Sequence, residues 1–327
     1  MSDASTTGRR RRSPARLLVA SLVGALLLGV SGCAGGDQGG RGRPSVVVTT
    51  NILGDITRNI VGDEAEVTVL MQAGADPHSF GVSAPQAASI ERADLVVYNG
   101  LGLEENVLRH VEAAEEAGVS TLAVGEAVDP LTYTAGASAD EPDPHFWTDP
   151  QRVGKAVGLI ADQVAEHVRG VDKAVVGKNA SAYGTQVTDL ASWMRKQFDV
   201  IPSEQRQLVT NHHVFGYLAQ RFGFRIVGAV IPSGTTLASP SASDLTSLST
   251  AIETAGVKAI FADSSQPDRL ARVLKRESDI EVDVVPLFSE SLTEKGEGAA
   301  TYLEMMRANT RSISMGLGTE QPRCRRS

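Results

Sequence analysis

The feature that most constrains the fold is an alternation of short β-branched runs and helical patterns, which a long stretch without strand patterns interrupts. The alternation runs from about residue 45 to residue 124 and resumes near residue 207. Strands that alternate with helices at this spacing form parallel sheets. We therefore predict an α/β protein with two lobes, each a parallel sheet flanked by helices.

The interruption contains two long helical segments that break near Gly170. The second, from about residue 171 to residue 198, carries apolar residues at helical spacing. A helix of that length extends ~40 Å, enough to run the length of the protein. We expect this helical segment to bridge the two lobes.

The pattern gives approximate bounds for the elements and for the domains. The expected strands are 46–50, 66–70, 94–100, 120–124, 207–211, 224–228, 257–262 and 282–286. The expected helices outside the interruption are 52–61, 85–93, 104–114, 213–223, 242–255, 268–275 and 298–312. The expected division is a leader (1–32), a flexible tether (33–44), a first lobe (45–149), a helical segment (150–199), a second lobe (200–315) and a polar tail (316–327).

The N-terminal segment has the features of an export signal. Five arginines precede an uncharged run of 14 residues, Leu17 to Val30, which is shorter than the ~20 residues that span a bilayer. The run ends in VSGC, which resembles the lipobox of bacterial lipoproteins, so we expect residues 1–32 to be removed and Cys33 to be lipidated. The alternative is an ordinary secretory leader with a chance cysteine. Both interpretations predict that the mature chain is exported.

Charge and cysteine content exclude several classes of protein. The chain has 31 Lys and Arg against 39 Asp and Glu, a net charge of −8, so we expect no nucleic-acid partner, because such proteins need a basic face. Loss of the leader removes five Arg and one Asp, which leaves about −12. The only two cysteines, Cys33 and Cys324, lie near opposite ends of the chain, which excludes a disulfide scaffold and a CxxC site. We assign no role to Cys324.

Four of the six histidines lie at element boundaries, where sites are usually built. They are His78, His145, His212 and His213, whereas His110 and His167 lie among charged residues of predicted helices. His78 and His145 each end an Asp-Pro-His tripeptide, in which the proline fixes the direction of the backbone. Neutral imidazole is a common ligand of zinc and related metals. The residues alone leave two readings open: a metal site, or histidines that bond to nearby carbonyl groups.

Five motifs in order resemble those of a known family, the solute-binding lipoproteins of zinc and manganese ABC importers (cluster A-I, or cluster 9). They are GADPHSF, ADLVVYNGLGLEENVL, DPHFWTDP, VTNHHVFGYLAQRFG and PLFSESL. The resemblance extends from about residue 46 to residue 315. It implies two α/β lobes joined by a single long helix, with one metal ion in the cleft between them.

The resemblance also implies a ligand set. His78 and His145 match the first two ligands of the family, and the position of Gly216-Tyr217 places the third at His212, with His213 in reserve. The fourth ligand of the family is an aspartate, and this chain has Glu290 at the matching position. Asp263, at the end of a predicted strand, is the other reserve candidate, and its alternative role is that of a turn residue.

Three imidazoles and one carboxylate suit Zn²⁺, whereas Mn²⁺ prefers more oxygen ligands. The loop at 132–144 contains no histidine, so we expect no auxiliary zinc-collecting loop. Ligation needs neutral imidazoles, so affinity is expected to fall as pH drops through ~6.5.

The resulting hypothesis is a monomeric, lipid-anchored extracytoplasmic protein that captures Zn²⁺ and delivers it to a membrane permease driven by an ATPase. The alternatives are a manganese-binding homologue, a zinc hydrolase with an open coordination position, and a surface adhesin on the same fold. If Glu290 is a ligand, it fills the position that a hydrolytic water would need. The sequence contains neither HExxH nor GxSxG. We expect no enzyme activity.

Overall fold

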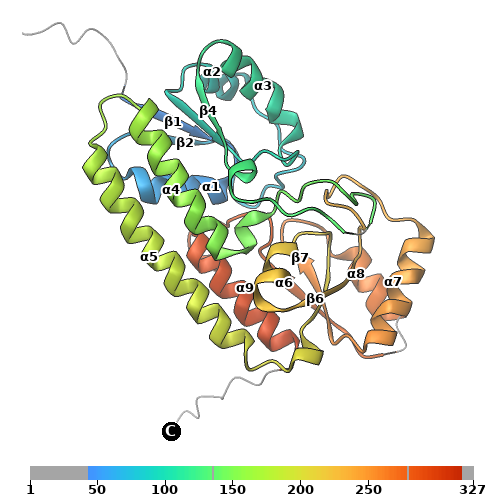
Figure 1. Cartoon of the computed structure of the whole chain (residues 1–327). Helices are drawn as coiled ribbons and strands as arrows, with labels where there is room; N and C mark the ends of the chain where they lie inside the picture. Colours follow the sequence, from blue (N-terminus) through green and yellow to red (C-terminus); the bar gives the residue numbers. More distant parts are fainter. Residues whose placement is uncertain (1–42, 135, 278–279, 319–327) are drawn as a thin grey trace, which may run out of the picture. The chain divides into compact units, whose positions relative to one another are not determined.

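The computed structural model describes residues 43–134, 136–277 and 280–318, and these contain two four-stranded sheets (Figure 1). The first has the order β2-β1-β3-β4, the second the order β6-β5-β7-β8, and all pairings between strands are parallel. The strands of the first sheet are β1 (Ser45–Val48), β2 (Glu66–Val69), β3 (Leu95–Tyr98) and β4 (Ser120–Ala123). Those of the second are β5 (Gln207–Thr210), β6 (Arg225–Ala229), β7 (Ala259–Asp263) and β8 (Asp283–Leu287). The predicted fold class is confirmed.

Helices flank both sheets. Their bounds are α1 (Asn51–Val61), α2 (Ala84–Glu91), α3 (Glu105–Glu116), α4 (Pro150–His167), α5 (Lys173–Phe198), α6 (Gly216–Phe222), α7 (Ala242–Ala255), α8 (Arg269–Glu277) and α9 (Tyr302–Gly316). Three short 3₁₀ segments are Gly125–Ala127, Phe146–Thr148 and Ser203–Gln205.

Within the described residues, no helix combines the length and the apolar character needed to cross a membrane. The expected leader, most of the tether, Cys33 and Cys324 lie outside the described residues.

Side chains alternate between the two faces of the first sheet. Val46 and Val48 of β1 face the core formed with α1 and α4. Val47, between them, packs with Ile90 of α2 and Val107 of α3 on the opposite face. Successive strand residues point to opposite faces, so this double burial explains the uninterrupted valine run in β1.

The second sheet is covered in the same way. Leu208 of β5 and Phe261 of β7 face α6 and α9, whereas Val209 and Ile260 face α7 and α8. Because helices cover both faces of the sheet, only the loops at the two ends of its strands are available to a ligand. In α/β sheets, ligands bind at the loops that follow the carboxyl ends of the strands.

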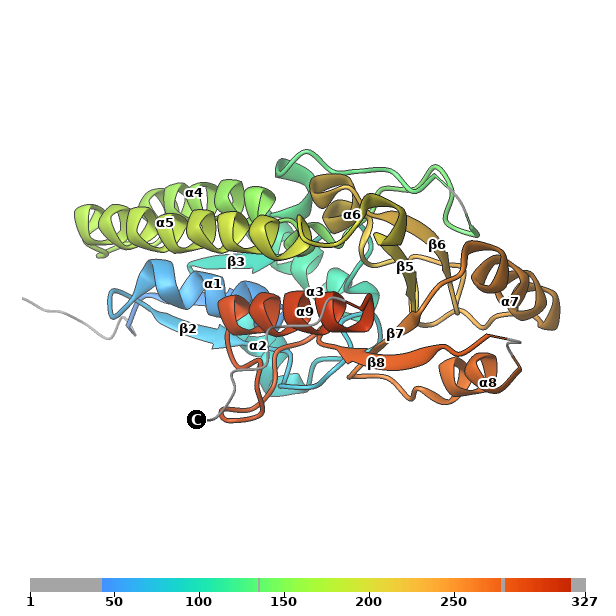
Figure 2. The same ribbon diagram turned by 90° about the horizontal axis from the view of Figure 1, so that it is seen from below.

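One apolar core joins the inner faces of the two sheets. The helix α5 packs against α1, α4 and α9, as the two views show (Figures 1 and 2). Its buried face carries apolar residues from Val176 to Phe198, and these belong to the cluster that also contains Val46 of the first lobe and Phe261 of the second. The expected linking helix is therefore part of the core.

The structure corrects two helix starts. Helix α6 begins at Gly216, three residues after the expected His213, and His213 lies in a bend. Helix α9 begins at Tyr302, not at Gly298, because the Thr301 side chain accepts the backbone N–H of Glu304 and caps the helix there. Both helices thus start later than their apolar pattern indicates.

Replacing Leu190 with alanine tests the role of the shared core. Leu190 lies on the buried face of α5 and is fully buried, so Leu190→Ala should lower the free energy of unfolding by about 2–5 kcal/mol. Val200, just after α5, is 66% exposed, and Val200→Ala should change that free energy by no more than about 0.5 kcal/mol. Urea denaturation of both variants measures the difference. Equal losses would contradict a core that runs through α5.

Candidate metal centre

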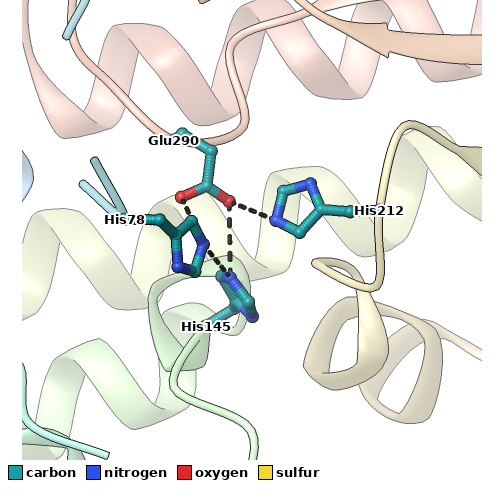
Figure 3. A group of neighbouring side chains, drawn as sticks. All are labelled: His78, His145, His212 and Glu290. Carbon is teal, nitrogen blue, oxygen red and sulfur yellow. Dashed lines mark hydrogen bonds and ion pairs between the residues drawn. The ribbon is translucent and has the colours of Figure 1, made fainter. Parts of the chain in front are cut away.

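Four buried side chains from distant parts of the chain meet between the lobes. They are His78, His145, His212 and Glu290, each at most 2% exposed. Each offers a nitrogen or oxygen atom that lies within 4.8 Å of those offered by the other three (Figure 3). The four residues expected as ligands are the four that the structure brings together.

The distances between these atoms match those around a single small cation. The Nε2 atoms of His78 and His145 are 3.4 Å apart. The carboxylate of Glu290 lies 3.1 Å from Nε2 of His212, 3.4 Å from Nε2 of His145 and 3.8 Å from Nε2 of His78. A tetrahedral ion with bonds of roughly 2.0–2.1 Å separates its ligand atoms by roughly 3.3–3.4 Å. The arrangement can hold such an ion with only small side-chain shifts.

The four ligand segments follow structural elements that fix their positions. His78 lies in the loop after β2, and His145 directly precedes the 3₁₀ segment that leads into α4. His212 follows the carboxyl end of β5, and Glu290 follows that of β8. Each lobe therefore contributes two side chains, and the centre is complete only when both lobes are in place.

The ring of His145 is oriented by Asp143. The Asp143 Oδ1 atom accepts the backbone N–H of His145 at 2.9 Å and lies 2.7 Å from the ring Nδ1. When Asp143 is ionised, this contact places the proton on Nδ1 and leaves the lone pair of Nε2 facing the other ligands. Histidines that bind metals commonly donate their second N–H to a carboxylate in this way.

The segment that carries Glu290 is held by residues of the first half of the chain. The indole of Trp147 donates to the Ser289 carbonyl at 2.9 Å. The side chain of Asn51 donates to the Ser291 hydroxyl at 2.7 Å and accepts the backbone N–H of Leu292 at 2.9 Å. Glu290 is therefore bracketed on both sides by contacts between the lobes.

The charge around the centre is negative. Besides Glu290, the carboxylates of Asp76, Asp143 and Asp263 are buried nearby and contribute to the electrostatics of the histidines or of Glu290. Among the described residues, none of these four carboxylates forms an ion pair with a lysine or arginine. A divalent cation would offset part of this charge.

Burial shifts the pKa values of the four side chains toward their neutral forms. It lowers the pKa of His78 to about 4 and that of His145 to about 3, and it also lowers the pKa of His212. Burial raises the pKa of Glu290 to about 7. The imidazoles are thus ready to ligate at neutral pH, and the expected imidazole titration near ~6.5 is replaced by protonation of Glu290.

Several ligand atoms have no hydrogen-bond partner in the described part of the chain. They are the Nε2 atom of His212 and both carboxylate oxygens of Glu290. A buried polar atom without a partner costs about 1–3 kcal/mol, and more when it is charged. Their convergence makes chemical sense if they coordinate a cation.

The two reserve residues lie outside this group. Asp263 ends β7, where its Oδ1 accepts the backbone N–H and the hydroxyl of Ser265, both at 2.5 Å, and its Oδ2 accepts the hydroxyl of Ser289. It is a turn residue that also holds the segment before Glu290. His213 is turned toward Tyr133, with ring centroids 6.2 Å apart. His110 lies on α3, and His167 ends α4.

The supporting residues were not predicted from the sequence. A usable signal existed for Asp76 and Asp143, because each precedes a candidate histidine by two residues and such an aspartate readily accepts a backbone N–H. No such signal exists for Asn51, which is 240 residues from Ser291.

Comparison with known proteins identifies the family. The family described as "Zinc-uptake complex component A periplasmic" matches residues 46–316, which is more than half of the chain. The chain belongs to this family. Its relatives are named as metal-binding proteins and as substrate-binding lipoproteins of metal ABC transporters, which are binding proteins and not enzymes.

The relatives cover nearly the same length. The manganese-binding lipoprotein MntA of Halalkalibacterium halodurans is 28% identical over 301 residues, which cover 90% of this chain and 97% of MntA. The zinc-binding protein TroA of Treponema pallidum is 28% identical over 285 residues, which cover 86% and 91%.

Solved structures share the fold. That of TroA matches with a TM-score of 0.76 at 28% identity, covering 84% of this chain and 99% of TroA. The manganese-bound periplasmic metal-binding protein of candidatus Liberibacter asiaticus matches with a TM-score of 0.74 at 26% identity, covering 84% and 100%.

The low pKa values of the histidines can be measured directly. In the metal-free protein, the ring nitrogens of His78 and His145 should keep the ¹⁵N NMR shifts of neutral imidazole, and not move to those of imidazolium, from about pH 8 to about pH 5, because desolvation keeps both rings neutral across the range in which an ordinary histidine titrates. Assignment comes from the variants His78→Gln and His145→Gln. Titration of either ring near ~6.5 would contradict the buried geometry.

Proposed function

We propose that this protein is the extracytoplasmic solute-binding component of a metal ABC importer, and that it captures Zn²⁺ between its lobes and delivers it to the permease. The observation that carries the proposal is the convergence of His78, His145, His212 and Glu290, whose ligand atoms lie within 4.8 Å of one another. Side chains from four distant segments, with carboxylates nearby that form no ion pair with a lysine or arginine of the described residues, favour a dication as the cargo.

The family supports the transport role. Relatives include the metal ABC transporter substrate-binding lipoprotein FimA of Streptococcus parasanguinis, 28% identical over 308 residues. We extend that role to this chain, with a permease and an ATPase as its partners. The lipobox-like VSGC, the names of the lipoprotein relatives and the family description support an exported protein that is anchored through Cys33.

The donor set favours zinc over manganese. Three imidazole nitrogens and one carboxylate are typical of four-coordinate Zn²⁺, and Mn²⁺ prefers more oxygen donors. The relatives are named for both metals, zinc in TroA and manganese in MntA. Manganese is therefore the alternative cargo. Binding through both carboxylate oxygens of Glu290 would add an oxygen donor and so favour Mn²⁺.

The ligand assignment is tested by alanine variants. The wild-type chain should bind one equivalent of Zn²⁺ and retain it in competition with Mn²⁺. His145→Ala removes one nitrogen and should weaken binding by more than the roughly 10–100-fold that is usual for a supporting residue. Isothermal titration with a competing chelator measures both affinities.

The matched control is His110→Ala. His110 lies on α3, away from the centre, so this variant should bind Zn²⁺ as tightly as the wild type. Equal weakening in both variants would contradict the assignment, and tighter retention of Mn²⁺ than of Zn²⁺ would select the alternative cargo.

Zinc affinity should fall as the pH drops below about 7. Glu290 must lose its proton to ligate, and burial raises its pKa to about 7. Asp143, whose pKa burial also raises to about 7, can orient His145 best as a carboxylate. Below that pH the metal displaces at least one proton, so affinity should decrease by about tenfold or more per pH unit and level off above pH 7. Chelator competition at several pH values measures the slope.

The variant Glu290→Gln serves as the control for this pH dependence. It removes one titrating group, so its weaker binding should depend less steeply on pH. A wild-type affinity that stays constant from about pH 8 to about pH 5 would contradict the raised pKa of Glu290, since that group would then already be ionised throughout.

A further inference from the structure

Asp76 and Asp143 begin the two Asp-Pro-His tripeptides, and they share one contact but differ in a second. Each accepts the backbone N–H of the histidine two residues later, at 3.0 Å for His78 and 2.9 Å for His145. Asp143 also contacts the ring of its histidine. Asp76 uses its second oxygen for residues of the other lobe.

The interlobe contacts of Asp76 are short. Its Oδ2 accepts the hydroxyl of Thr236 at 2.7 Å and the side-chain amide of Gln266 at 2.8 Å, in addition to the hydroxyl of neighbouring Ser79 at 3.2 Å. Thr236 lies in the loop between β6 and α7, and Gln266 in the loop between β7 and α8. Both loops belong to the end of the second sheet that also carries His212 and Glu290.

These two contacts depend on lobe position more than on local folding. Within the described residues Asp76 forms no ion pair with a lysine or arginine, and it is 9% exposed. Hydrogen bonds to a carboxylate are strong but need donor–acceptor distances below about 3.2 Å. A small separation of the lobes therefore breaks both bonds and leaves only the local bonds to His78 and Ser79.

We propose that Asp76 is a positioning residue that slows metal release by joining the backbone of His78 to Thr236 and Gln266 across the cleft. This inference rests on the proposed function, since it concerns the residence of the metal in the same centre. One oxygen fixes the segment of His78, and the other holds that segment to the second lobe. The ion leaves when the lobes part, so loss of the interlobe bonds speeds dissociation.

The double variant Thr236→Val/Gln266→Leu removes the interlobe donors and leaves all four ligands and the Asp76–His78 contact in place. The rate constant for Zn²⁺ dissociation, measured by stopped flow with excess chelator, should rise by about 10- to 100-fold. The association rate constant should change much less. The visible absorption of the Co²⁺-loaded protein should match the wild type, because the same four atoms coordinate the ion.

The matched control is Thr246→Val/Gln207→Leu, the same pair of changes at residues of the second lobe that bond only within that lobe. It should release Zn²⁺ at the wild-type rate. As a second probe, Asp76→Ala should release Zn²⁺ at least as fast as the Thr236→Val/Gln266→Leu variant, because it loses the contact to His78 as well.

Three outcomes would overturn the inference. The first is a dissociation rate for Thr236→Val/Gln266→Leu equal to that of the wild type or of the control. The second is an altered Co²⁺ spectrum, which would mean that the ligands themselves have moved. The third is a fall in the unfolding temperature of the metal-free Thr236→Val/Gln266→Leu variant as large as the fall in its metal-loaded form, which would indicate a general packing role. A wild-type chain that binds neither Zn²⁺ nor Mn²⁺ would instead overturn the proposed function, and the inference with it.

Discussion

The arrangement of this molecule depends on one continuous apolar core that includes the inner faces of both sheets. Helix α5 packs against α1 of the first lobe and α9 of the second, and all three contribute to that core, so the lobes are joined by packed side chains as well as by the chain itself. Separating the lobes widely would expose this shared surface to water, at a cost of about 25 cal/mol per Å² of apolar area. Movements that admit and release a ligand are therefore expected to be small and to involve the loops at the strand ends.

The site at these loops is prepared for a cation by burial. Desolvation keeps the three imidazoles neutral, and it raises the pKa of Glu290 to about 7. Near neutral pH the metal-free centre can therefore hold a proton on Glu290 without a positive charge on the histidines. Exchange of that proton for a dication satisfies the carboxylate and the lone pairs of the imidazoles together. Because Asp76, Asp143 and Asp263 lie nearby and form no ion pair with a lysine or arginine of the described residues, the centre favours a positive charge that these side chains do not supply.

The sequence predicted the fold class and the four converging side chains, but only part of their support. Valine-rich runs such as Val46–Val48 identify strands buried on both faces, and the family motifs point to His78 and Glu290. The start of α6 was predicted too early, because the apolar pattern continues through Val214 and Phe215 although these residues precede the helix. The contacts of Asn51 with Ser291, and of Asp76 with Gln266, join residues 240 and 190 positions apart. No local sequence pattern predicts contacts between residues so far apart along the chain, since these contacts depend on how the two lobes are placed.

The order of the ligands along the chain has a consequence for biosynthesis. Glu290 is the last of the four, and its segment is steadied by Asn51 and Trp147, which the ribosome adds much earlier. A nascent chain that ends before residue 290 contains three imidazoles but no carboxylate to complete the set. It cannot sequester an ion in the finished geometry while it is still being made. The site matures only when nearly the whole polypeptide is available to fold.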